Sequence, residues 1–361
     1  MKKLTQKIKG LKKTTKVDFA TYLGVVLAFA AVTLLGRLGL LNRFLTGMLV
    51  PICAYIVMAV SLNLTVGILG ELSLGHAGFM SVGAFSGVIA AQSLQASIPS
   101  APVRLAVAIL VGAVFASAAG FIVGVPVLRL RGDYLAIVTL AFGEIIKELI
   151  NCLLVGYDSR GLHMAFNING SLTISDLGLE PEGIAIIKGA QGATGTTTIA
   201  TFTAGFILIM ITLVIVLNLV RSRAGRAIMA LRDNRIAAES VGVNVTKYKL
   251  MAFVTSAALA GAAGALYGLN YSNLAASKFS FDTSILVLVY VVLGGLGNMW
   301  GSIVAAAVLY ILPEALREFA DYRMLVYAVV LILVMLATNN DQLKALAGRI
   351  LPKRKGAADN G

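Results

Sequence analysis

The chain has 361 residues, of which 58% are hydrophobic and only 13% are charged. Soluble domains carry about a quarter charged residues, so this composition excludes an ordinary soluble protein and indicates an integral membrane protein. The formal net charge of +13 comes from Lys and Arg residues that cluster in short segments. Membrane topology explains that clustering better than nucleic-acid binding does, and no nucleic-acid partner is expected.

Apolar segments of about twenty residues recur along the chain, the length that crosses a hydrocarbon layer of about 30 Å. A basic tail, residues 1–18, precedes the first of them, which we interpret as an uncleaved span rather than a signal peptide. We expect an all-α polytopic membrane protein with about ten transmembrane helices within residues 19–338, followed by a basic tail, residues 339–361. The spans outside the ambiguous region 284–312 are expected at about 19–41, 46–66, 72–94, 103–125, 134–155, 200–220, 250–271 and 324–337.

Region 284–312 allows either one long tilted span or two short spans that turn at Gly294–Gly301. With two spans, both termini lie on the inside, and the inside segments hold 21 Lys and Arg residues against seven in the outside loops. Positive residues concentrate on the cytoplasmic side of membrane proteins. The charge distribution therefore favours ten spans with both termini cytoplasmic.

Two of the expected spans carry small residues at four-residue spacing, which lets helices pack closely in lipid. These residues are Gly112, Ala116, Gly120 and Gly124 in one span, and Ala260, Gly264 and Gly268 in the other.

Residues 221–249, called the basic segment below, form a polar and positively charged stretch between two long apolar runs. Apolar residues recur near helical spacing between Gly225 and Ser240, and Gly242 supplies a helix stop. We interpret it as a cytoplasmic coupling loop, a short amphipathic helix on which a partner acts. The alternative is a solvated loop that only sets topology, which is the favoured reading for Arg221, Arg223 and Arg226.

The sequence carries no visible catalytic apparatus. The glycine-rich stretch 189–198 lacks the Lys of a phosphate-binding loop. His76 and His163 share no metal-ligand spacing with each other or with the two cysteines. We therefore expect no catalytic, cofactor or metal site, and any ATP-driven work would fall to a partner.

Four stretches together resemble the branched-chain amino-acid ABC transporter permease family, in its LivM-like branch. They are residues 63–79, residues 128–144, the basic segment and residues 293–301. The resemblance covers about 54–336. It implies the ABC importer permease fold in a prokaryotic plasma (inner) membrane, and import of branched-chain or related hydrophobic amino acids by alternating access. It also implies the partners: a second homologous permease subunit, two ATPase subunits and an external substrate-binding protein.

The coupling loop of such importers resembles Glu-Ala-Ala-x-x-x-Gly. Ala237, Ala238 and Gly242 match this pattern, while Ile236 stands where the Glu would be. From the resemblance we expect contact with the ATPase at Asp233, Asn234, Ala237, Ala238, Glu239 and Gly242.

Polar residues within the apolar spans are candidates for the translocation pathway, because such residues are costly in lipid. The candidates are Asn63, Ser73, His76 and Glu144. Helix N-termini near Ser73 and His76 would suit a carboxylate. The plainer readings are that His76 is a packing residue and that Glu144 pairs with Lys147 or Glu148.

Residues 156–199 form a long external segment that either docks the binding protein or serves as a flexible connector. Within the same family, urea and short amides are alternative substrates. A self-sufficient ion-coupled carrier, with Glu144, Lys147 and Glu148 as its coupling site, remains a different class. An integral-membrane enzyme is disfavoured because no catalytic cluster is present.

Overall fold

A computed structural model describes residues 13–39, 42–128, 133–167, 172, 174–180, 183–315, 328–329 and 332. It divides into two compact units, Met1–Ala307 and Val308–Gly361. The tail at 339–361, and nearly all of the expected span at 324–337, lie outside the described residues. The helices and sheet discussed below belong to the first unit, apart from the end of the last helix.

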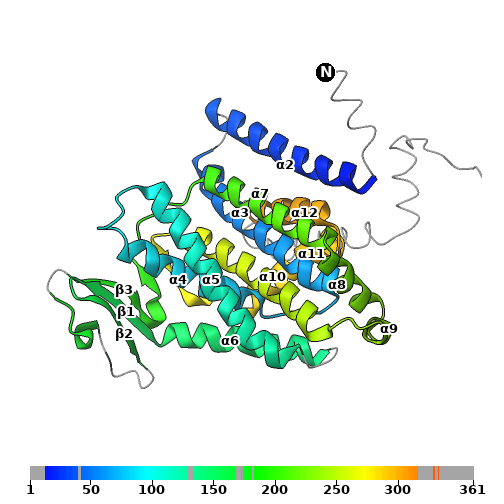
Figure 1. The fold of residues 1–361 in the computed structure, drawn as a ribbon. Helices are drawn as coiled ribbons and strands as arrows, with labels where there is room; N and C mark the ends of the chain where they lie inside the picture. The colour runs from blue at the N-terminus through cyan, green and yellow to red at the C-terminus, as the bar shows by residue number, and fades with distance from the viewer. Residues whose placement is uncertain are drawn as a thin grey trace, which may run out of the picture. The chain divides into compact units, whose positions relative to one another are not determined.

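Helices coincide with each of the first nine expected spans (Figure 1). They are α2 (Lys13–Arg37), α3 (Arg43–Asn63), α4 (His76–Ser93), α5 (Ala101–Val127), α6 (Asp133–Asn151), α7 (Phe202–Arg221), α10 (Val245–Gly268), α11 (Phe281–Gly294) and α12 (Met299–Ala315). By length and composition, four described helical segments are able to cross a membrane: Leu45–Leu69, Ala101–Val127, Phe202–Arg221 and Val245–Gly268. The total of ten spans and the cytoplasmic termini stay predictions.

The ambiguous region forms two helices rather than one tilted span. Helix α11 ends at Gly294 and α12 begins at Met299, and the turn between them uses positive φ angles of 94° at Gly295 and 80° at Gly297. Glycine adopts such angles without the steric cost that a side chain adds. The region is therefore two helices, and that each of them crosses the membrane stays a prediction.

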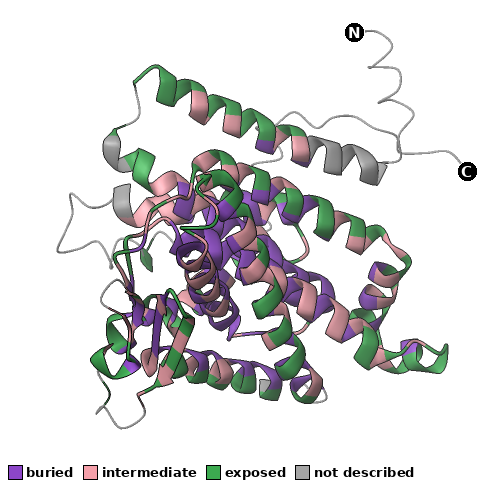
Figure 2. Ribbon diagram, turned by 60° about the vertical axis from the view of Figure 1, so that its left-hand side comes forward, coloured by how far each residue is buried: buried purple, intermediate pink, exposed green. Residues whose placement is uncertain are grey.

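The centre of the first unit is the contact among α4, α5 and α10. Figure 2 shows the buried residues gathered where helices face one another, with exposed residues on the outer faces. At Gly83 the backbone of α4 lies against Gly261 of α10, with no room for a side chain between them. Gly112 of α5 meets the same place, and Gly264 lies against the carbonyl of Met80. The small residues that the sequence showed at four-residue spacing thus form the core of the packing.

Helix α3 continues into a π-helix, η1 (Leu64–Leu69), and the chain then turns at Gly70, where φ is 80°. Residues 71–75 are not helical, and α4 begins at His76 rather than at the expected Leu72. Irregular backbone at membrane depth is tolerated only where protein covers it. Ser73 and His76 are accordingly buried.

Residues within 153–194 form a small sheet together with residues 273–274, so the all-α expectation is wrong there. Its antiparallel strands are β1 (Leu153–Asp158), β2 (Gly161–Phe166), β3 (Ile184–Lys188), β4 (Ala193–Thr194) and β5 (Asn273–Leu274), in the order β2-β1-β3-β4-β5. Short 3₁₀ turns, η2 (Ile174–Leu177), η3 (Gly189–Gln191) and η4 (Ala276–Phe279), accompany the strands. The expected span 134–155 ends early, at Asn151, because Leu153 onward pairs with strands on both sides.

Gly264 offers a test of the central packing. In Gly264→Leu, the new side chain would overlap the carbonyl of Met80, and overpacking of this kind costs about 1–3 kcal/mol or more. Gly47→Leu is the matched control, because nothing lies within 4 Å of a Cβ at that position. Thermal unfolding of the purified proteins in detergent should show a lowered midpoint for Gly264→Leu alone. Equal midpoints for the two variants would contradict the packing described.

Candidate functional site

The basic segment folds into two short helices rather than one. Helix α8 (Arg223–Asp233) and helix α9 (Arg235–Ser240) meet at Asn234, whose extended backbone interrupts the helix. The Asn234 side chain accepts a hydrogen bond of 3.1 Å from the N–H of Ala237 and so caps α9. Ser222 caps α8 in the same way through the N–H of Gly225, at 3.1 Å. Both side chains satisfy amide groups that a helix start leaves open.

Helix α9 ends at Ser240, two residues before Gly242, where the sequence predicts a helix stop. Gly242 has a φ of 84°, its N–H donates to the carbonyl of Glu239, and the N–H of Val243 donates to the carbonyl of Ala238. This pair of bonds is the Schellman pattern, in which glycine supplies the left-handed residue. The predicted helix stop is confirmed.

The two faces of α9 differ sharply in exposure. Ala238 is buried, whereas Ile236 is 80% exposed and Val241 is 78% exposed. The structure therefore places Ala238, one of the expected ATPase contacts, against the chain itself. The apolar side chains that project from the basic segment to solvent are instead Ile236 and Val241.

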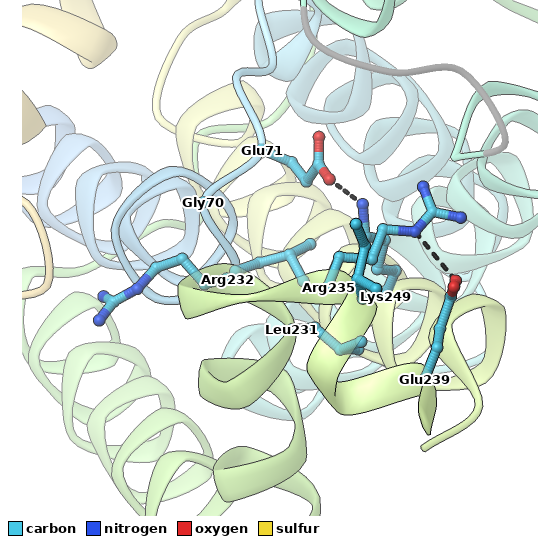
Figure 3. A pocket seen from close by; sticks show the side chains of 9 residues that line it. Gly70, Glu71, Leu231, Arg232, Arg235, Glu239 and Lys249 are labelled. Atoms are coloured by element: carbon cyan, nitrogen blue, oxygen red, sulfur yellow. Dashed lines mark hydrogen bonds and ion pairs between the residues drawn. The ribbon is translucent and has the colours of Figure 1, made fainter. Parts of the chain in front are cut away.

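A cleft of about 370 Å³ lies between helices α8 and α9 of the basic segment, the end of η1 and the start of α10 (Figure 3). Its lining residues are Leu69, Gly70, Glu71, Leu231, Arg232, Arg235, Ile236, Glu239 and Lys249. Two ion pairs organise it. Arg235 meets Glu239 at 3.0 Å within α9, and Lys249 of α10 pairs with Glu71, both of their side chains being largely buried.

Arg232 joins the basic segment to the end of η1. Its guanidinium donates a 2.9 Å hydrogen bond to the carbonyl of Gly67 and also pairs with Asp233 at 3.1 Å. Its aliphatic stem passes so close to Gly70 that a side chain there would collide with it. Asp233, another expected ATPase contact, thus helps to hold Arg232.

Asn63, predicted as a pathway residue, lies fully buried at the junction of α3 with the α11–α12 turn. Its amide donates to Ser302 Oγ at 2.8 Å, and its carbonyl oxygen accepts the N–H of Gly297 at 2.8 Å. We call this set of contacts the Asn63 junction. The geometry is that of a residue fixing three elements together.

His76 and Ser73 lie in the irregular stretch before and at the start of α4. His76 Nε2 lies 2.8 Å from Ser61 Oγ, and because that hydroxyl donates to the carbonyl of Met58, the ring nitrogen is the donor. This matches the plainer reading of His76 as a packing residue. The buried Ser73 hydroxyl has no hydrogen-bond partner within the described part of the chain.

Glu144 forms the ion pair with Lys147 that the sequence allowed, and its other oxygen accepts the N–H of Phe281 at 3.1 Å. Its side chain is 35% exposed. The carboxylate therefore anchors the first turn of α11 to α6. A place for Glu144 in the translocation pathway stays a prediction.

Sequence reasoning overlooked several polar side chains that tie the helices together: Ser61, Glu71, Lys249, Ser256, Ser284 and Ser302. Ser256 Oγ donates to the carbonyl of Ser61 at 2.5 Å, and Ser284 accepts the N–H of Ala77 at 3.1 Å. A serine within an apolar span was the available signal, because such residues hydrogen-bond across helices in lipid. Across the described residues, no group of three or more His, Cys, Asp or Glu is placed to hold a metal ion.

The five-stranded sheet carries a polar cluster around Asp158. This buried carboxylate accepts the N–H of Arg160 at 2.9 Å, His163 Nε2 at 3.1 Å and the N–H of Glu180 at 3.4 Å. Burial alone would raise the pKa of Asp158, but these three donors favour the ionised form more strongly and lower its pKa.

The apolar helices, their small-residue packing and the scarcity of charge inside them define a multi-pass helical membrane protein. The family model described as branched-chain amino acid transport system / permease component matches residues 44–336. The chain therefore belongs to this family of transport permeases. No solved structure matches it.

Individual relatives agree with the family. The high-affinity branched-chain amino acid transport system permease protein LivM of Salmonella typhimurium is 35% identical over 309 residues, which cover 82% of this chain and 70% of the relative. Its counterpart of the same name in Escherichia coli is 34% identical, over 78% of this chain and 66% of the relative. The fructose import permease protein FruG of Bifidobacterium longum is 25% identical over 87% and 88%. The chain thus spans about two thirds of the length of the two LivM proteins.

The Asn63 junction predicts a large cost for Asn63→Ala. The substitution leaves the N–H of Gly297 without its buried acceptor, and each buried polar group left unpaired costs about 1–3 kcal/mol. Asn218→Ala, at an exposed position of α7, is the matched control. Thermal unfolding in detergent should separate the two variants by several degrees, and a wild-type midpoint for Asn63→Ala would show that the junction contributes nothing.

The Asp158 cluster predicts a local loss of stability in acid. Because its pKa is lower in the folded protein, Asp158 contributes stability that is complete above the unfolded value of about 3.9 and is lost as the pH falls through the folded value. Pepsin cleavage within residues 153–196 should therefore accelerate below about pH 4. Asp158→Asn should be cleaved faster at mildly acidic pH and show a smaller change with pH. Identical pH profiles for the two proteins would contradict the assignment.

Proposed function

We propose that the chain is the permease subunit of an ATP-binding-cassette importer for branched-chain or related hydrophobic amino acids. It would work by alternating access in a prokaryotic inner membrane. Family membership sets the class, and the names of the two LivM relatives support the substrate. The partners would be a second homologous permease subunit, two ATPase subunits and an external substrate-binding protein.

The observation that carries the proposal is the shape of the basic segment. Two capped helices, α8 and α9, stand beyond the ends of the long helices (Figure 1). Ile236 of α9 and Val241, which follows the last residue of α9, are both mostly exposed to solvent. Apolar side chains in such a setting mark a surface for a partner. The caps hold the first turns of α8 and α9 in place. Movement of an ATPase docked on α9 would therefore displace the two helices as units and reach the helices packed against them.

The external sheet supports a second docking surface. Strand β2 exposes the alternating residues Leu162, Met164 and Phe166, which share one face of the sheet. The sheet and the basic segment lie beyond opposite ends of the long helices (Figure 1). A binding protein on the sheet and an ATPase on α9 would thus act from opposite sides, as the proposed mechanism requires.

The carrier alternative receives less support from the geometry. Its coupling site would be Glu144, Lys147 and Glu148, yet Lys147 pairs with both carboxylates and Glu144 is also bonded to the first turn of α11. Urea and short amides remain alternative substrates within the family. Partner dependence separates the importer from the carrier, because a carrier transports alone.

Ile236→Glu tests the docking of the ATPase. The substitution places a charge in the middle of the proposed contact, so the ATPase should no longer copurify with the tagged permease and ATP-driven transport should be lost. Thr246→Glu is the matched control, because it adds the same charge at an exposed position in the first turn of α10, where an acidic residue is tolerated.

The measurements are copurification from the native membrane and amino-acid uptake into liposomes. Normal copurification and transport by Ile236→Glu would remove α9 from the interface. Transport by the chain alone, driven by an ion gradient without ATP, would overturn the importer itself.

A further inference from the structure

We propose that Arg232 is a positioning residue that transmits movement of α8 and α9, through the π-helix η1, to the Asn63 junction. The inference rests on the proposed function, since it assumes that an ATPase moves α9 and α8. It adds the route by which that movement reaches the helices.

The first step is the bond from Arg232 to the carbonyl of Gly67. The last carbonyls of a helix have no partner within it, and here a side chain from a helix 165 residues later in the chain supplies one. The same side chain lies against Gly70, which follows η1. Helix α8 therefore contacts the chain at Gly67 within η1 and at Gly70 just after it. Figure 3 shows Arg232 and Gly70 at the edge of the cleft.

The second step is the contact of η1 with the Asn63 junction. Gly67 lies against both Asn63 Oδ1 and the backbone of Gly297, with no space for a side chain. Asn63 in turn bonds Gly297 and Ser302 on either side of the start of α12. A displacement of Gly67 towards these atoms would therefore either move the turn between α11 and α12 or break the hydrogen bond between Gly297 and Asn63.

The third step is the ion pair that attaches the chain to α10 immediately after Gly70. Glu71 pairs with Lys249 of α10, and both side chains are largely buried. Removing one member of such a pair leaves an uncompensated charge, so the pair resists separation. Gly67 is thus attached to α8 and Glu71 to α10, and the left-handed Gly70 lies between the two attachments.

The π-helix suits this role. At its C-terminal end, the N–H groups of Gly70 and Glu71 both donate to the carbonyl of Thr65, a wider and less regular arrangement than the end of an α-helix. Single π-turns within α-helices occur frequently at functional sites. Movement of α8 relative to α10 would change the chain direction at Gly70 and shift the last turn of η1.

The test uses the complete importer in liposomes, with the ratio of amino acid transported to ATP hydrolysed as the readout. Arg232→Gln should retain the ATPase and continue to hydrolyse ATP, while the ratio falls by at least about five-fold, the lower end of typical coupling between sites. Arg232→Lys should restore part of the ratio, because an ammonium group still donates to the carbonyl of Gly67. Arg235→Gln is the matched control, since Arg235 lines the same cleft and, among the described residues, forms its ion pair with Glu239 of its own helix.

Hydrogen exchange in residues 64–75, measured in the complex with and without a nonhydrolysable ATP analogue, provides a second readout. The analogue should change exchange in the wild type and in Arg235→Gln but not in Arg232→Gln. Gly70→Ala displaces the Arg232 stem and should uncouple in the same way, so it decides the matter if Arg232→Gln does not assemble.

Two kinds of failure are distinguishable. A wild-type complex without ATP-driven amino-acid uptake would overturn the proposed function. A working wild type, with normal ratios in Arg232→Gln or, where that variant does not assemble, in Gly70→Ala, would overturn the link through Arg232 and leave the importer in place.

Discussion

The rest of the structure depends on the close approach of α4, α5 and α10 at their glycines and alanines. Lipid offers helices no hydrophobic gain from pairing, so the gain must come from van der Waals contact at short range. Gly83, Gly112 and Gly261 bring three backbones to one point. This contact holds α4 against its neighbours, and Ser73 and Gly75 of the irregular stretch that leads into α4 are buried.

The polar bonds around that irregular stretch follow from the same constraint. Backbone groups freed by a helix break need partners when no water is present. Thr139 of α6 accepts the N–H of Leu74, and Ser284 of α11 accepts the N–H of Ala77. Ser61 and His76 bond each other, and Ser256 of α10 bonds the backbone of Ser61. The dispersed serines of the apolar spans thus serve one region, which explains why each looks isolated in the sequence.

Local sequence patterns predicted the features that interactions between neighbouring residues determine, namely the helices and one helix end. Apolar length located nine helices among the described residues, and Gly242 ended α9 because a left-handed residue is needed there. Contacts between distant residues escaped prediction. Strand β5 pairs with β4 about 80 residues earlier, so the sheet had no signal within a single window. Arg232 and Gly67, or Lys249 and Glu71, carry no pattern that pairs them. The sequence pattern placed Asn234 within a single helix. Its role as the N-cap of α9 depends on an extended backbone at this residue, which the apolar spacing does not indicate.

Residues 63–76 gather these constraints in one short stretch. Asn63 bonds the α11–α12 turn, Gly67 bonds α8, Glu71 bonds α10 and His76 bonds α3. A regular α-helix would repeat its faces every 3.6 residues and would carry such contacts as one rigid rod. The π-turn and the left-handed Gly70 replace that rod with two segments that meet at an angle. The segment before Gly70 is bonded to α8 and the segment after it to α10. Relative movement of α8 and α10 would therefore change the backbone at Gly70, where the two segments meet.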